Sequence, residues 1–198
     1  MFKEIALGTA AALALSSFSG AALAKSPVPG KPGDMNIVEI AIDVNATLGE
    51  FDYLLGAVAC LTDPDGNNPV VDLLTGEDKY TLFAPTDAAF EALQMALGIP
   101  VPSPELTCEV DNLFGPGTLL TVLAYHVTEG RHFSNSVFNK NNPKMLEMLT
   151  GDYVITNPDL TLTDGAGQQA AVVPPLVNIN ASNGVIHVVN TVLLPFAP

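Results

Sequence analysis

The sequence predicts an α+β domain in which helices fill the first half of the chain and strands the second. Apolar residues recur at helical spacing between residues 47 and 124, whereas after Asp152 short apolar runs alternate with tight-turn residues. The 198 residues suffice for one domain of ordinary size but are few for two. We therefore expect one sheet or sandwich that carries helices.

The first 24 residues have the form of a secretory signal peptide. Residues 5–15 are an apolar run without a charge, and Ala22-Leu-Ala24 is the small-residue pattern at which a signal peptidase cleaves. The run is shorter than the roughly 20 residues that span a bilayer, so we expect cleavage and no stable membrane insertion. Residues 25–35 are rich in proline and glycine and predict an extended linker. The folded domain would then cover residues 36–198.

Helices are expected in the segment that follows the linker. Residues 37–44 are apolar but do not decide between helix and strand. Thr47-Leu-Gly-Glu50 has the form of a capping box. Behind it apolar residues recur at i, i+3, i+4 and i+7, which predicts a helix ending near Cys60 whose buried residues are Phe51, Leu54, Leu55 and Val58. Another short helix is expected over residues 70–74.

Residues 80–84 predict a strand, which Pro85 ends. Thr86 and Asp87 can cap the next helix, because a hydroxyl oxygen accepts a free N–H group and a carboxylate suits the positive end of the helix dipole. That helix would bury Phe90, Leu93 and Leu97. The proline-rich residues 99–117 predict an irregular loop, and residues 119–124 a further helix followed by a short extended piece at 125–127.

The rest of the chain predicts one short helix and then strands. Asn142-Pro143 is a typical helix start, so we expect a helix carrying Met145, Leu146 and Leu149. Residues 160–162 and 170–173 flank a turn at 164–167 and predict a hairpin, after a strand at 153–155. Residues 177–181 alternate, with asparagines on the face expected to be exposed. Asn183-Gly184 predicts a tight turn into a strand at 185–189.

The charge balance excludes two classes of partner. The formal net charge is −14, and removal of the leader leaves it unchanged because Lys3 and Glu4 cancel. Binding of nucleic acid through phosphate contacts is therefore not expected, nor is attraction to anionic lipid headgroups. An acidic surface keeps an exported protein soluble, and it could also recruit divalent cations as bridges to other anionic surfaces.

The two cysteines, Cys60 and Cys108, are expected to form a disulfide in an oxidising compartment. They lack the C-x-x-C spacing of a redox motif, so we interpret the bond as structural. It would close a loop of about 48 residues, for which chain-entropy arithmetic allows about 4 kcal/mol of stabilisation.

Residues that could carry chemistry do not form a recognisable site. None of the three histidines lies in H-E-x-x-H, and no serine lies in G-x-S-x-G. Residues 63–68 suggest a calcium loop, but the spacing is wrong and the same residues are typical of a turn. Met95, Met145 and Met148 could line a pliable apolar pocket, although such residues more often fill cores. We predict no enzyme, no cofactor and no metal.

Four segments together resemble the fasciclin (FAS1) family. Residues 80–90, YTLFAPTDAAF, resemble its first motif, and residues 122–127, VLAYHV, its tyrosine–histidine motif. Residues 183–195, NGVIHVVNTVLLP, resemble its closing motif, and residues 36–42, NIVEIAI, its opening. Their order fits one domain over nearly the whole exported chain.

The resemblance implies a wedge-shaped β-sandwich with several helices and a secreted, periplasmic or cell-surface setting. It implies a role in adhesion, with a protein or polysaccharide as partner and with Thr86, Asp87, Tyr125 and His126 as candidate binding residues. It also implies a hydrogen bond from His126 to Thr86 or Asp87, so we expect His126 to support the fold first. Some family members bind carotenoids, and the alternative function is therefore a carrier of an apolar small molecule.

Overall fold

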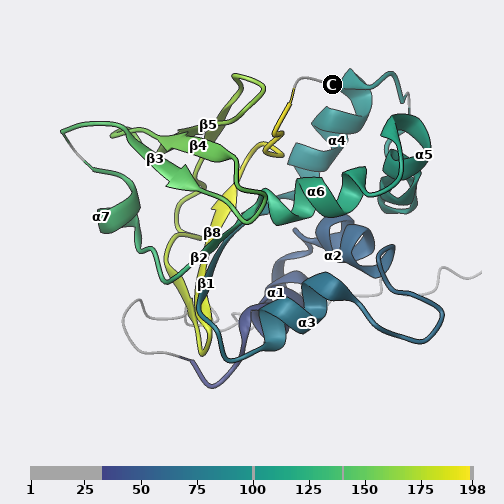
Figure 1. Cartoon of the computed structure of the whole chain (residues 1–198), viewed down its shortest axis with the longest axis horizontal. Helices are drawn as coiled ribbons and strands as arrows, with labels where there is room; N and C mark the ends of the chain where they lie inside the picture. The colour runs from purple at the N-terminus through teal and green to yellow at the C-terminus, as the bar shows by residue number, and fades with distance from the viewer. Residues whose placement is uncertain (1–32, 100, 140, 197–198) are drawn as a thin grey trace, which may run out of the picture.

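A computed structural model describes residues 33–196 apart from 100 and 140. Two four-stranded sheets lie face to face, in the orders β2-β1-β8-β7 and β3-β4-β5-β6. Helices cover the other face of the first sheet, so the layers run helices, sheet, sheet (Figure 1). The expected α+β class with a β-sandwich is confirmed. The predicted signal peptide and most of the linker lie outside the described residues.

The first sheet is the centre of the molecule. Its two middle strands, β1 (Tyr80–Pro85) and β8 (Gly184–Val189), are parallel and buried along their whole length. On the edges, β2 (Val127–Glu129) pairs with β1 and β7 (Ile179–Ala181) pairs with β8, both antiparallel. Strands buried on both faces have continuous apolar sequences, as these do. A Cβ at Gly184 would collide with the Tyr80 carbonyl oxygen, so glycine permits this pairing.

The second sheet consists of antiparallel strands β3 (Lys144–Glu147), β4 (Tyr153–Thr156), β5 (Thr161–Thr163) and β6 (Gln169–Ala171). The β5–β6 hairpin confirms the one predicted. The helix predicted after Pro143 is wrong, because those residues form β3 and pair with β4. A turn at Gly151, where φ is +85°, folds the chain back on itself and supplies the partner strand that a local pattern does not reveal.

Most helices belong to the layer on the outer face of the first sheet, where they pack either on the sheet or on other helices. In chain order they are α1 (Ile37–Leu48), α2 (Asp52–Ala59), α3 (Pro69–Thr75), α4 (Asp87–Ala96), the 3₁₀ helix η1 (Pro104–Glu109), α5 (Val110–Phe114) and α6 (Thr118–Ala124). A short helix, α7 (Ser134–Val137), lies beside the sandwich instead (Figure 1). The helices predicted at residues 70–74, after Thr86 and at 119–124 are confirmed.

Three local predictions are wrong. The capping box belongs to Asn36 and Glu39 at the start of α1, whereas Thr47 lies within α1, which ends at the left-handed Gly49. The predicted loop at 99–117 contains η1 and α5, because short helices pair backbone groups that an irregular loop packed against the domain would leave unpaired. Asn180 in β7 is buried rather than exposed, since its side-chain oxygen accepts a hydrogen bond from Arg131.

Candidate functional site

His126 lies in the core and joins two distant parts of the chain. It follows α6, and its ring is 1 % exposed. Its Nδ1 lies 2.7 Å from the Val122 carbonyl oxygen and its Nε2 accepts a hydrogen bond of 2.9 Å from the Leu193 N–H. The predicted bond to Thr86 or Asp87 is therefore wrong. Because the Leu193 N–H needs an acceptor, the ring is neutral and carries its proton on Nδ1.

Burial lowers the pKa of His126 to about 4, and the hydrogen bond to Val122 offsets this only in part. An imidazole away from water is costly to charge, so the ring stays neutral at physiological pH. A group so placed is not available to a partner molecule. Its evident role is to hold the segment after β8 against α6.

The side chain of Tyr125 points into the core between the two sheets. Its side chain is fully buried between the sheets. The hydroxyl donates to the Tyr153 carbonyl oxygen and accepts from the Gly165 N–H, both at 2.9 Å. Burial raises its pKa, so the phenol remains protonated and can donate. Tyr125 and His126 are neighbours at the end of α6, and both side chains are buried. Tyr125 lies in the core between the two sheets, whereas His126 lies in the core beneath the helices.

Thr86 and Asp87 connect β1 to the helices. Thr86 is the N-cap of α4 and its hydroxyl accepts from the Ala89 N–H, as predicted. The Asp87 carboxylate accepts instead from the Tyr53 N–H at 3.0 Å, at the start of α2. Burial raises the pKa of Asp87, although the hydrogen bond from the Tyr53 backbone opposes this. Thr86 and Asp87 therefore connect the start of α4 to the start of α2, and neither residue is hydrogen-bonded to His126.

The other candidate residues do not converge on a site. His187 is buried among the aromatic rings of Phe83 and Phe138, and its Nε2 lies 2.8 Å from the His132 carbonyl oxygen. Asp63 accepts hydrogen bonds from the backbone of residues 65 and 67, so residues 63–68 form the expected turn. Across the described residues, no group of three or more His, Cys, Asp or Glu side chains is placed to hold a metal ion.

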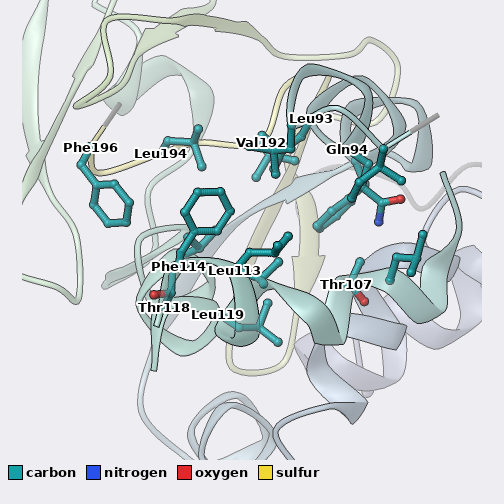
Figure 2. Close-up of a pocket in the computed structure, with 16 residues that line it drawn as sticks. Leu93, Gln94, Thr107, Leu113, Phe114, Thr118, Leu119, Val192, Leu194 and Phe196 are labelled. Carbon is teal, nitrogen blue, oxygen red and sulfur yellow. The ribbon is translucent and has the colours of Figure 1, made fainter. Parts of the chain in front are cut away.

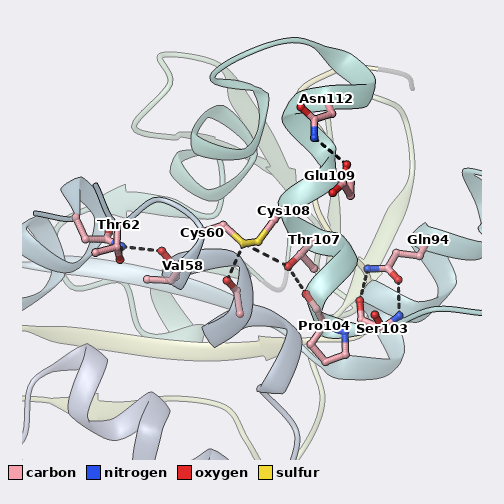
Figure 3. The surroundings of a disulfide bond; sticks show 12 residues. Val58, Cys60, Thr62, Gln94, Ser103, Pro104, Thr107, Cys108, Glu109 and Asn112 are labelled. Carbon is pink, nitrogen blue, oxygen red and sulfur yellow. Dashed lines mark hydrogen bonds between the residues drawn. A yellow bond between two sulfur atoms is a disulfide. The ribbon is translucent and has the colours of Figure 1, made fainter. Parts of the chain in front are cut away.

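The disulfide between Cys60 and Cys108 is present and ties η1 to the end of α2 (Figure 3). Beside it the buried Gln94 side chain donates to the Ser103 carbonyl oxygen and accepts from the Ser103 N–H, both at 2.9 Å. The bond and the amide bridge therefore hold η1 between α2 and α4. This arrangement fixes one wall of the groove described next.

An apolar groove lies between α4 and the C-terminal segment on one side and η1, α5 and α6 on the other (Figure 2). Among the described residues that line it, the polar side chains are Gln94, Thr107 and Thr118. The remainder are aliphatic or aromatic: Phe90, Leu93, Leu97, Ile99, Leu106, Val110, Leu113, Phe114, Leu119, Val122, Val192, Leu194 and Phe196. The space that the centre of a water molecule can reach is only about 50 Å³.

No motif or periodicity in the sequence predicts this groove. Two features of the sequence could have revealed it: the apolar residues Val110, Leu113 and Phe114, inside the stretch expected to be a loop, and Phe196 near the C-terminus. The three methionines that suggested an apolar pocket do not line it. Met148 is buried between the sheets, whereas Met95 and Met145 are exposed.

The fold and the site define a helix-covered β-sandwich whose motif residues stabilise its interior. The family model described as fasciclin domain matches residues 66–195. This chain belongs to the fasciclin domain family, which is often involved in adhesion or extracellular interaction.

Two cyanobacterial proteins from Synechocystis sp. are similar along most of the chain. Uncharacterized protein sll1735 is 31 % identical over 161 residues, which are 80 % of this chain and 97 % of that protein. Protein sll1483 is 29 % identical over 164 residues, 81 % of this chain and 74 % of that protein. The solved FAS1 domain pair of the insect cell adhesion molecule Fasciclin I is 16 % identical with a TM-score of 0.47, and the match covers 72 % of this chain and 45 % of that one.

Proposed function

We propose that this domain is a non-enzymatic adhesion or interaction module that works outside the cytoplasm, at a cell surface, and binds a protein or a polysaccharide. The observation that carries the proposal is the placement of its functional groups. The motif side chains are hydrogen-bonded inside the fold, whereas the exposed face of the helical layer presents carboxylates and an apolar groove. Binding rather than bond-making chemistry is what such a surface supports.

The setting outside the cytoplasm rests on two further observations. The disulfide fits an oxidising compartment, in which such bonds form and persist. Fasciclin domains are typically extracellular. Within residues 33–196, no helix is long and apolar enough to cross a bilayer.

An attachment assay tests the proposal. Beads coated with the purified protein should adhere to cells or to polysaccharide-coated surfaces more than beads coated with heat-denatured protein. Loss of attachment on chelation would assign a bridging role to divalent cations. Attachment no better than that of the unfolded control would contradict the proposal, and so would reproducible substrate turnover that one interior substitution abolishes.

The second candidate is a carrier of an apolar small molecule such as a carotenoid, and the apolar lining of the groove favours it. The volume of the groove argues against a carrier, because ligand pockets commonly enclose about 300–1,000 Å³ and this groove encloses about 50 Å³. A carrier would need the groove to open. Visible absorption from a pigment that copurifies with the protein would support this candidate.

A further inference from the structure

The rim of the groove exposes large apolar side chains that the described residues leave uncovered. Leu113 and Phe114 of α5 are 59 % and 42 % exposed, and Phe196 is 44 % exposed. Figure 2 shows Phe114 and Leu113 on one wall and Phe196 at one end, all beside the buried lining. Exposed apolar groups that gather in one place mark interaction surfaces, because a partner that covers them removes them from water.

The segments that form the groove carry acidic residues and no lysine or arginine. Between Lys79 and Arg131 there is no lysine or arginine, although that stretch includes α4, η1, α5 and α6. Exposed Glu91, Glu105 and Glu109 lie on the elements that form the walls. The elements that form the groove therefore carry exposed carboxylates and no lysine or arginine, so the electrostatic complement of this side of the molecule is a positively charged apolar surface.

The shape selects the kind of occupant. Space of about 50 Å³ admits the tips of side chains rather than a whole small molecule. The lining also provides few hydrogen-bonding groups, so an extended peptide would bury backbone N–H and C=O groups without partners at substantial cost. A helix pairs its own backbone groups and can insert side chains spaced at i, i+3, i+4 and i+7.

We propose that this groove docks a cationic amphipathic helix of a partner protein. Its apolar stripe packs on Leu113, Phe114 and Phe196, and its flanking lysines or arginines face Glu105 and Glu109. The proposal deepens the proposed function and rests on it, because it names a protein as the partner and the groove as the surface used. Removal of the apolar rim from water supplies most of the affinity, and the carboxylates steer the approach.

Fluorescence anisotropy with the disulfide-bonded protein tests the proposal. The probe is a labelled synthetic peptide of about 18 leucine and lysine residues, long enough for a helix, with the leucines on one face. A scrambled peptide of the same composition keeps the charge but loses the stripe. We expect the amphipathic peptide to bind clearly more tightly than the scrambled one, and added salt to weaken binding.

Matched variants locate the binding surface. Leu113→Ser should weaken binding roughly fivefold or more, because it removes an apolar contact of the rim. Leu120→Ser alters another exposed leucine, outside the groove on α6, and should leave binding unchanged. Glu105→Gln with Glu109→Gln should weaken binding about twofold and flatten its salt dependence. The matched pair Glu129→Gln and Glu147→Gln, on β2 and β3, should have no such effect.

Four results would overturn the inference. The first is that the scrambled peptide binds as tightly as the amphipathic one, and the second is that groove and control variants have equal effects. The third is that a neutral apolar dye binds the groove and the peptide does not. The fourth is that the chain forms a dimer that Leu113→Ser dissociates. The last two would assign the groove to a small molecule or to a second copy. Bead attachment that Leu113→Ser leaves intact would refute this site and keep the proposed function, whereas peptide binding without attachment would do the reverse.

Discussion

The two faces of the central sheet are covered in different ways. On the side of the second sheet, the core holds aromatic rings and polar side chains, including Tyr125 and His187, which are hydrogen-bonded to the backbone. On the helical side, the core is largely aliphatic, a disulfide crosses its outer edge, and the apolar groove opens beside it. The same strands supply both cores, since Leu82 faces the helices and the adjacent Phe83 faces the second sheet.

This difference separates a core that is enclosed between two sheets from one whose edge opens into the groove. No buried side-chain nitrogen or oxygen of the described residues lacks a hydrogen-bond partner, which is how a core away from water accommodates polar groups. The helical layer contains several short helices, which tertiary contacts must stabilise. It leaves apolar side chains exposed at its edge. We infer that the sandwich supplies rigidity and that the helical layer supplies the contact surface. Three predictions test that division.

The largest effect is expected from the disulfide of the helical layer. Replacing Cys60 and Cys108 with serine should lower the free energy of unfolding by up to about 4 kcal/mol, because the unfolded chain loses the constraint of a closed loop. Urea titration of both proteins measures this. Limited proteolysis should then cut first between residues 99 and 117, while the sandwich persists. A loss below about 1 kcal/mol would show that packing alone holds η1 in place.

The next effect comes from His126, which joins α6 to the segment after β8. Burial lowers its pKa to about 4 in the folded protein, whereas in the unfolded chain the value is about 6.5. Between these values the unfolded chain binds a proton that the folded protein does not, so stability falls as the pH drops from 6.5 to 4. The loss at pH 4 should be on the order of 3 kcal/mol relative to neutral pH, and above pH 6.5 the term is constant.

A variant isolates this contribution from that of other titrating groups. His126→Gln keeps an amide that can donate to Val122 and accept from Leu193, and it should flatten the slope of unfolding free energy against pH between 6.5 and 4. A slope that His126→Gln leaves unchanged would remove this histidine from the acid response, whereas a smaller slope should remain because burial also lowers the pKa of His187.

The smallest of the three effects concerns the closed sandwich core. Tyr125→Phe should lower the free energy of unfolding by about 2 kcal/mol, because the Tyr153 carbonyl and the Gly165 N–H lose their buried partner. Tyr153→Phe removes a hydroxyl from a side chain that is 47 % exposed and should change stability by less than about 0.5 kcal/mol. Chemical denaturation of both variants makes the comparison. Equal effects would mean that the core tolerates unpaired groups or contains water.

Local sequence patterns predicted the parts of the site that depend on near neighbours. The Thr86 cap of α4 was correct because its hydrogen bond joins residues three positions apart. The turn before β8 was also correct, but the side chain of Asn183 is bonded to the backbone of Ile37 and Leu74, which lie 146 and 109 positions away. Long-range partners were not predictable in this way. The Tyr53 N–H that Asp87 binds and the Leu193 N–H that His126 binds lie 34 and 67 positions away.

The sequence by itself therefore determined the class of the fold, most of the helices, the hairpins and the disulfide, because periodicity, caps and turns act within one element. Only the tertiary structure decided the parallel pairing of β1 with β8, the strand at 144–147 and the groove. Each of these joins backbone or side chains from segments far apart in the chain. Which apolar residues stay exposed depends on how the finished layers fit together, and no local pattern contains that information.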